Sequence, residues 1–99
     1  MAFAIFEIKK EDARKIDQII RDDLVSRQSI TTRDASSLEI DKNVMYVKIE
    51  GSEDAIKRAE ELFKEIGGVK LSDKDADEIN KKIEAQDESA AMGMGNIFG

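Results

Sequence analysis

The chain has 99 residues, a formal net charge of −6 at pH 7, and neither cysteine nor histidine. This length supports one hydrophobic core, and 40% apolar residues interleaved with charge is typical of a globular domain. The missing residue types exclude disulfides, thiolate or imidazole metal sites, and cysteine or histidine catalysis, so we expect a non-enzymatic protein without cofactor or metal. The acidic balance makes nucleic acid and anionic membranes unfavourable partners.

Residues 2–8 predict a strand that is apolar on both faces. One face carries Phe3 and Ile5, and the other carries Ala4, Phe6 and Ile8. A strand of this kind usually lies in the centre of a sheet. The segment has no basic leader and reaches Glu7 too early for a signal or membrane-spanning segment, which favours a cytoplasmic location.

An amphipathic helix is predicted over residues 10–25. Glu11 and Asp12 suit its first turn, and its apolar residues recur at helical spacing, namely Ala13, Ile16, Ile19, Ile20 and Leu24. Residues 28–40 are mostly polar, so we expect an irregular edge strand there. Asp41, Lys42 and Asn43 then predict a tight hairpin turn.

The strand predicted over residues 44–50 is also apolar on both faces. Met45, Val47 and Ile49 alternate with Val44, Tyr46 and Lys48. Ser52 is expected to cap the following helix, which ends at Gly67 and Gly68 because glycine suits the left-handed conformation common there. Residues 69–71 predict a short fourth strand.

A third helix is predicted over residues 73–86, beginning with the capping-box-like pair Ser72 and Asp75. Its apolar stripe is thin and consists of Ala76, Ile79 and Ile83. Residues 87–99 show no strand or helix period and predict a flexible tail. We therefore expect one domain over residues 1–86, with a core over 2–71 and an added helix over 73–86.

This order of elements, β-α-β-β-α-β, predicts an α+β ferredoxin-like two-layer sandwich with an extra C-terminal helix. The first and third strands are central in that topology, which agrees with their richness in apolar residues. Both strands would then leave an apolar patch on the sheet face opposite the two helices.

The candidate interaction surface is this patch together with two apolar residues of the tail: Phe3, Ile5, Val44, Tyr46, Ile97 and Phe98. A second copy of the chain, the third helix with its tail, or another protein could cover the patch. The leading hypothesis is therefore a protein-interaction or assembly module, acting as a homodimer or with a protein partner.

Two alternatives use other patterns. Phe3 or Phe6 with Tyr46 invites comparison with RNA-recognition modules, but only Arg33 and Lys48 supply positive charge nearby, so RNA binding is disfavoured. The strand-helix-strand rhythm from Met45 to Leu71 resembles that of small amino-acid-binding regulatory domains of the ACT type. This resemblance implies a metabolite held at a dimer groove, although the chain has Lys9-Lys10-Glu11-Asp12 where those domains have a glycine-containing turn.

Short polar motifs predict structural roles rather than chemistry. Asp22 and Asp23 stand at the unfavourable end of the first predicted helix, where Arg21 and Arg27 can balance them. Asp73, Asp75 and Asp77 lack the glycine and the glutamate of a calcium loop. The hydroxyls of Thr32, Ser36 and Ser37 have no histidine base, which leaves no expected nucleophile.

Overall fold

The computed structural model describes the backbone of residues 2–98 and the side chains of residues 2–86. Its strands are β1 (Ala2–Lys9), β2 (Ser29–Asp34), β3 (Val44–Gly51) and β4 (Val69–Lys70). Its helices are η1 (Lys10–Lys15), α1 (Ile16–Ile20), η2 (Val25–Arg27), η3 (Ala35–Leu38), α2 (Glu53–Glu65) and α3 (Asp73–Phe98), where η denotes a 3-10 helix. The fold is therefore mixed α+β.

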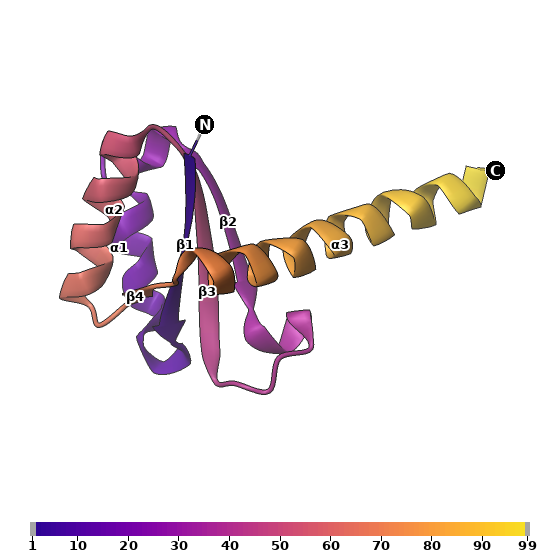
Figure 1. The fold of residues 1–99 in the computed structure, drawn as a ribbon, viewed down its shortest axis with the longest axis horizontal. Helices are drawn as coiled ribbons and strands as arrows, with labels where there is room; N and C mark the ends of the chain where they lie inside the picture. The colour runs from indigo at the N-terminus through magenta and orange to yellow at the C-terminus, as the bar shows by residue number, and fades with distance from the viewer. Residues whose placement is uncertain (1, 99) are drawn as a thin grey trace.

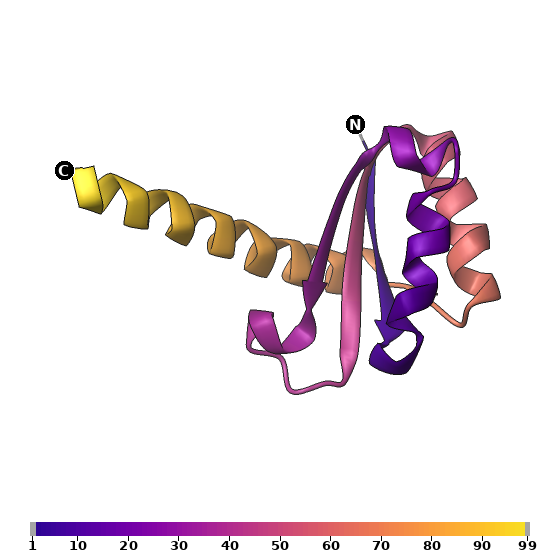
Figure 2. The ribbon, with the colours of Figure 1, turned by 180° about the vertical axis from the view of Figure 1, so that it is seen from behind.

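The four strands form one antiparallel sheet in the order β2-β3-β1-β4. The central positions of β1 and β3 are those predicted from their apolar residues on both faces. Helices α1 and α2 cover one face of this sheet, and α3 crosses the opposite face and continues beyond it (Figures 1 and 2). The sheet is thus packed against helices on both sides.

The main hydrophobic core lies between the sheet and helices α1 and α2. It contains eleven buried residues: Ala4, Phe6, Ile8, Ile16, Ile19, Val25, Val47, Ile49, Ile56, Ala59 and Phe63. Phe6 of β1 pairs with Val47 of β3, so the strand residues on this face follow the twofold alternation predicted from the sequence. A second, separate cluster lies between the sheet and α3.

The prediction of one continuous helix over residues 10–25 is wrong. Its first turns are the 3-10 helix η1, regular α-helix is confined to Ile16–Ile20, and η2 follows a turn. The side chain of Asp22 accepts hydrogen bonds from the backbone N–H groups of Leu24 and Val25, both at 3.2 Å. These bonds offer the backbone an alternative to the helical ladder, which explains the break.

The connection between β2 and β3 also differs from the prediction of a long edge strand and a tight turn. Strand β2 ends at Asp34, whose side chain accepts a 3.0 Å hydrogen bond from the N–H of Ser36 and so caps η3. Asp34 is already opposite Met45 of β3, so residues 35–43 form a loop that contains η3.

The predicted ends of α2 are confirmed. The Oγ atom of Ser52 accepts a 3.2 Å hydrogen bond from the N–H of Ala55, and Gly67 has a φ angle of 80° beyond the last turn. The same type of cap begins α3, because Ser72 Oγ accepts a 3.3 Å hydrogen bond from the N–H of Asp75. Both helix starts were therefore encoded locally.

Helix α3 is longer than the predicted 73–86, because its backbone is helical through Phe98. The side chains of residues 87–98 lie outside the described part of the chain, so the flexible tail remains a prediction. No described helix combines the length and the apolar composition needed to cross a membrane.

Candidate functional site

The strand register places Phe3, Ile5, Val44 and Tyr46 on one face of the sheet, which we call the α3 face. Ile5 and Tyr46 are buried there under α3, with 0% and 2% of their surface exposed. Val44 is half-buried against the same cluster, whereas Phe3 is 37% exposed. The third helix is thus the cover for much of the predicted patch, and the side chains of Ile97 and Phe98 lie outside the described residues.

Helix α3 docks on this face through a small set of contacts. The buried side chains of Ala76, Ile79 and Ile83 meet Ile5 and Tyr46, with Ala35 and Leu38 of η3 completing the cluster. Near the end of the described side chains, Gln86 links the helix to the β2–η3 region by two hydrogen bonds. Its Nε2 atom donates to the carbonyl oxygen of Ser37, and its Oε1 atom accepts from Arg33 Nε at 3.0 Å.

The part of the α3 face that the helix leaves open carries both an aromatic side chain and charged side chains. The ammonium Nζ of Lys48 lies 5.3 Å from the centroid of the Phe3 ring, within the range of a cation-π contact. Phe3 also lines a groove with Asp73, Lys74, Ala76 and Asp77 of α3. Among the described residues of the predicted surface, Phe3 is therefore the accessible aromatic.

The other aromatic residues considered for RNA binding are not accessible. Phe6 is fully buried and stacks on Phe63, and Tyr46 lies beneath α3. Base stacking needs an exposed ring, so of these three aromatic side chains only Phe3 could provide one.

A cavity of about 270 Å³, which we call the Tyr46 cavity, opens beside α3. Four chain segments supply its lining: Glu7, Ile40, Lys42, Tyr46, Leu71, Asp75, Glu78, Ile79 and Lys82. This site was not among those predicted from the sequence. The spacing of Asp75, Glu78 and Lys82 is a local signal, because it places three charges on one side of α3, but their approach to Glu7 depends on how the helix crosses the sheet.

The environment of Tyr46 changes the acidity of its hydroxyl. Burial raises the pKa of the Tyr46 phenol, and the negative charges of Glu7 and Asp75 raise this pKa further. The phenol therefore stays protonated and neutral across the physiological range. Both of these carboxylates line the cavity together with Tyr46.

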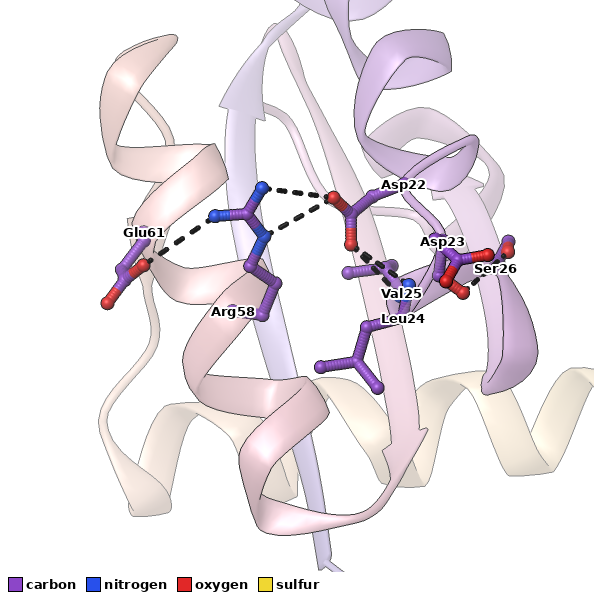
Figure 3. Close-up of polar contacts among 7 residues, drawn as sticks. All are labelled: Asp22, Asp23, Leu24, Val25, Ser26, Arg58 and Glu61. Carbon is purple, nitrogen blue, oxygen red and sulfur yellow. Dashed lines mark hydrogen bonds and ion pairs between the residues drawn. The ribbon is translucent and has the colours of Figure 1, made fainter.

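The adjacent pair Asp22 and Asp23 has a structural explanation. Figure 3 shows Asp22 between the backbone N–H groups of Leu24 and Val25 and the guanidinium of Arg58, whose Nη2 atom is 3.2 Å away. Desolvation raises the pKa of Asp22, but the hydrogen bonds and the charge of Arg58 together lower this pKa below its usual value. Asp22 therefore joins the turn after α1 to helix α2.

Asp23 lies outside this arrangement and pairs with Arg27 at 3.5 Å, and its side chain is 93% exposed. The sequence analysis expected Arg21 and Arg27 to balance the pair of carboxylates. Arg27 does so for Asp23, whereas Arg58 of α2 is the partner of Asp22.

The hydroxyls of Ser36 and Ser37 are engaged in the loop after β2. Ser36 Oγ donates to Asp34 Oδ1 at 2.9 Å, and Ser37 Oγ donates to the Asp34 carbonyl oxygen at 2.7 Å. Within the described residues, no group of three or more acidic side chains is arranged to hold a metal ion. These hydroxyls and carboxylates therefore have local structural roles.

Comparisons with protein-family models, with curated proteins and with solved structures found no match for this chain. The function proposed below is therefore inferred from the contacts, burial and charges of the described residues.

Proposed function

We propose that this chain is a non-enzymatic protein-interaction module whose α3 face binds an amphipathic helix. In the single chain that helix is α3, and in an assembly it is the α3 of a second copy. The observation that carries the proposal is the separation of the two clusters: the residues packed under α1 and α2 are distinct from those packed under α3. The sheet and its first two helices therefore keep a core of their own when α3 is replaced.

The small contact area of α3 supports this exchange. In the part of the helix whose side chains are described, Ala76, Ile79 and Ile83 belong to the cluster, and burying two isoleucines contributes roughly 3–6 kcal/mol. Ordering the segment offsets part of this gain. A helix held by so few contacts can detach by local unfolding. Detachment exposes the apolar patch to water, so rebinding of a helix to the patch is favourable.

A second copy is the partner that the contacts favour most. Exchange of α3 between two chains reproduces every contact of the α3 face without any new surface, which makes swapping a low-cost route to a homodimer. The helix continues past the edge of the sheet, so its docked part is one portion of a longer element (Figure 2).

The proposal includes a ferredoxin-like assignment for the sheet with α1 and α2. The strand order β2-β3-β1-β4 and the position of both helices on one face support this assignment. It also includes the cytoplasmic location and the absence of enzymatic activity, which rest on the sequence alone.

The decisive experiment detaches α3 from the α3 face in the full chain. The Ile79→Asp/Ile83→Asp variant places two charges in the apolar contact, and Lys81→Asp places one on the exposed side of the same helix as the matched control. A fluorescent peptide of residues 73–86 is then titrated into each variant, with circular dichroism as the check on folding.

We expect the peptide to bind the double variant at least about tenfold more tightly than the control, whose face is occupied by its own helix. Light scattering over a concentration series should show dimers of the wild type and of the control but only monomers of the double variant. A folded double variant that binds no peptide would overturn the proposal. Wild-type chains that stay monomeric at all concentrations would rule out exchange between copies.

A further inference from the structure

The Tyr46 cavity has the composition of a small binding site rather than of a gap in the packing. The apolar part of its lining consists of Ile40, Leu71, Ile79 and Tyr46. Its volume of about 270 Å³ is roughly nine times the ~30 Å³ that one water molecule occupies in the liquid. It therefore has room for a small organic molecule.

The charged groups of the lining have both signs, and no ion pair is recorded for them in the part of the chain that the structure describes. Glu7, Asp75 and Glu78 supply carboxylates, and Lys42 and Lys82 supply ammonium groups. Within the described residues, none of these five side chains forms an ion pair with N···O within 4.0 Å. The neighbouring pair on α3 behaves differently, because Lys81 Nζ lies 3.3 Å from Asp77.

The hydroxyl of Tyr46 is the third observation. The residue is 2% exposed, and within the described residues its hydroxyl makes no hydrogen bond. Within the described residues the buried side-chain atom without a partner is Asn80 Oδ1, so the Tyr46 hydroxyl oxygen keeps some exposure. Tyr46 lines the cavity together with Glu7 and Asp75, so a bound molecule can replace the water that otherwise meets this hydroxyl.

We propose that the Tyr46 cavity binds a small zwitterion that carries a primary ammonium group and a carboxylate. Glu7, Asp75 and the Tyr46 hydroxyl receive the ammonium, which has three donors for three acceptors. Lys42 and Lys82 receive the carboxylate. A ligand with only one sign of charge would satisfy one of these sets and face repulsion from the other.

This inference is independent of helix exchange, because it requires only that α3 be docked as in the structure. The test is therefore made on the full chain, with the ligand-induced shifts of backbone amide NMR signals as the readout. The probes are the free amino acids, which are zwitterions of suitable size. Each amino acid that binds is compared with its N-acetyl form, which lacks the ammonium, and its amide, which lacks the carboxylate. Putrescine tests a dication.

We expect saturable shifts centred on the cavity lining for at least one amino acid, with a Kd on the order of 10 μM to 1 mM. Loss of either charge from that ligand should weaken binding at least about fivefold. Tyr46→Phe, Asp75→Asn and Lys82→Gln should each weaken binding similarly. The matched controls Asp77→Asn and Lys81→Gln change neighbouring residues outside the lining and should leave binding unchanged.

Three results would overturn the inference. The first is that no amino acid shifts the lining signals in the folded wild-type chain. The second is that the amide or putrescine binds as tightly as the amino acid, which would show an ammonium site only. The third is that the control substitutions weaken binding as much as those in the lining, which would place the ligand elsewhere on α3.

Discussion

The ring of Phe6 in β1 stacks on the ring of Phe63 in α2, with centroids 4.4 Å apart and planes inclined by 14°. Both residues are fully buried, so this pair joins the centre of the sheet to the helix that covers it. We expect Phe6→Ala to lower the free energy of unfolding by about 3–5 kcal/mol, because it removes a large core side chain and leaves a cavity.

The control for this substitution lies on the same strand. Phe3→Ala removes an identical side chain that is 37% exposed and contacts Lys48, so its cost should stay near ~1 kcal/mol. Urea denaturation of both variants measures the difference. Equal losses would mean that the two rings are buried alike and would contradict the described packing.

Asp22 and Asp23 form a natural matched pair for a second prediction. Asp22→Ala should destabilise the chain, because it leaves the N–H groups of Leu24 and Val25 and the guanidinium of Arg58 without their acceptor. Asp23→Ala should have little effect, because its ion pair with Arg27 is exposed. Thermal unfolding midpoints give the comparison.

Asp22→Asn separates the two functions of this carboxylate. Asparagine keeps an oxygen that can accept from the backbone but loses the charge that attracts Arg58. We expect a midpoint between those of the wild type and Asp22→Ala. If Asp22→Asn were as unstable as Asp22→Ala, the ion pair rather than the turn would dominate.

Asp34 should make the stability depend on pH in acid. The side-chain hydrogen bond from Lys10 and the hydrogen bonds from Ser36 lower the pKa of Asp34 from 3.8 to about 2. The unfolded chain therefore takes up this proton at a higher pH than the folded chain. The stabilisation is present above about pH 4 and is lost as the pH falls toward about 2.

Asp34→Asn removes this titration and keeps an oxygen that can cap η3. The difference in unfolding free energy between wild type and this variant should therefore shrink between pH 5 and pH 2. Lys10→Met, which removes the partner 2.9 Å from Asp34, should reduce the same dependence. A difference that stays constant across this range would show that Asp34 has the same pKa in both states.

Gly51 and Gln28 should be energetically coupled. The Gln28 side chain donates from Nε2 to the Leu24 carbonyl at 3.1 Å and accepts from the Ser52 N–H at 3.2 Å. A Cβ atom added at Gly51 would overlap Gln28 Oε1, so Gly51→Ala must displace this amide. We expect a loss of about 1–2 kcal/mol, the usual cost of breaking such hydrogen bonds.

The cost should nearly vanish when Gln28→Ala is already present, because the overlapping atoms are gone and alanine suits a strand better than glycine. A double-mutant cycle in urea measures this coupling. Additive effects of the two substitutions would show that Gly51 is required for a reason other than the Gln28 side chain.

Local sequence patterns determined much of the core. Strands β1 and β3 are apolar on both faces, so only central positions between two packed layers can bury them. The caps at Ser52 and Ser72 and the positive φ angle at Gly67 were also predictable, since each depends on residues within one turn of the chain.

Other features depended on contacts between distant segments. The helix beginning near residue 10 breaks where Asp22 binds backbone N–H groups and Arg58, a partner 36 residues away in the sequence. The amphipathic pattern over residues 10–25 favours a continuous helix, because local periodicity contains no information about such a partner.

By itself, the sequence determined a mixed α+β fold and two central strands that are apolar on both faces. Only the tertiary structure decided that α3 provides the cover and that Glu7, Tyr46 and Asp75 meet at one cavity. The physical reason is that apolar residues repeat every two residues in a strand and every 3.6 residues in a helix, and this repeat fixes which side of each element is apolar. The choice of the element that packs there depends on the shape and the connection of the whole chain.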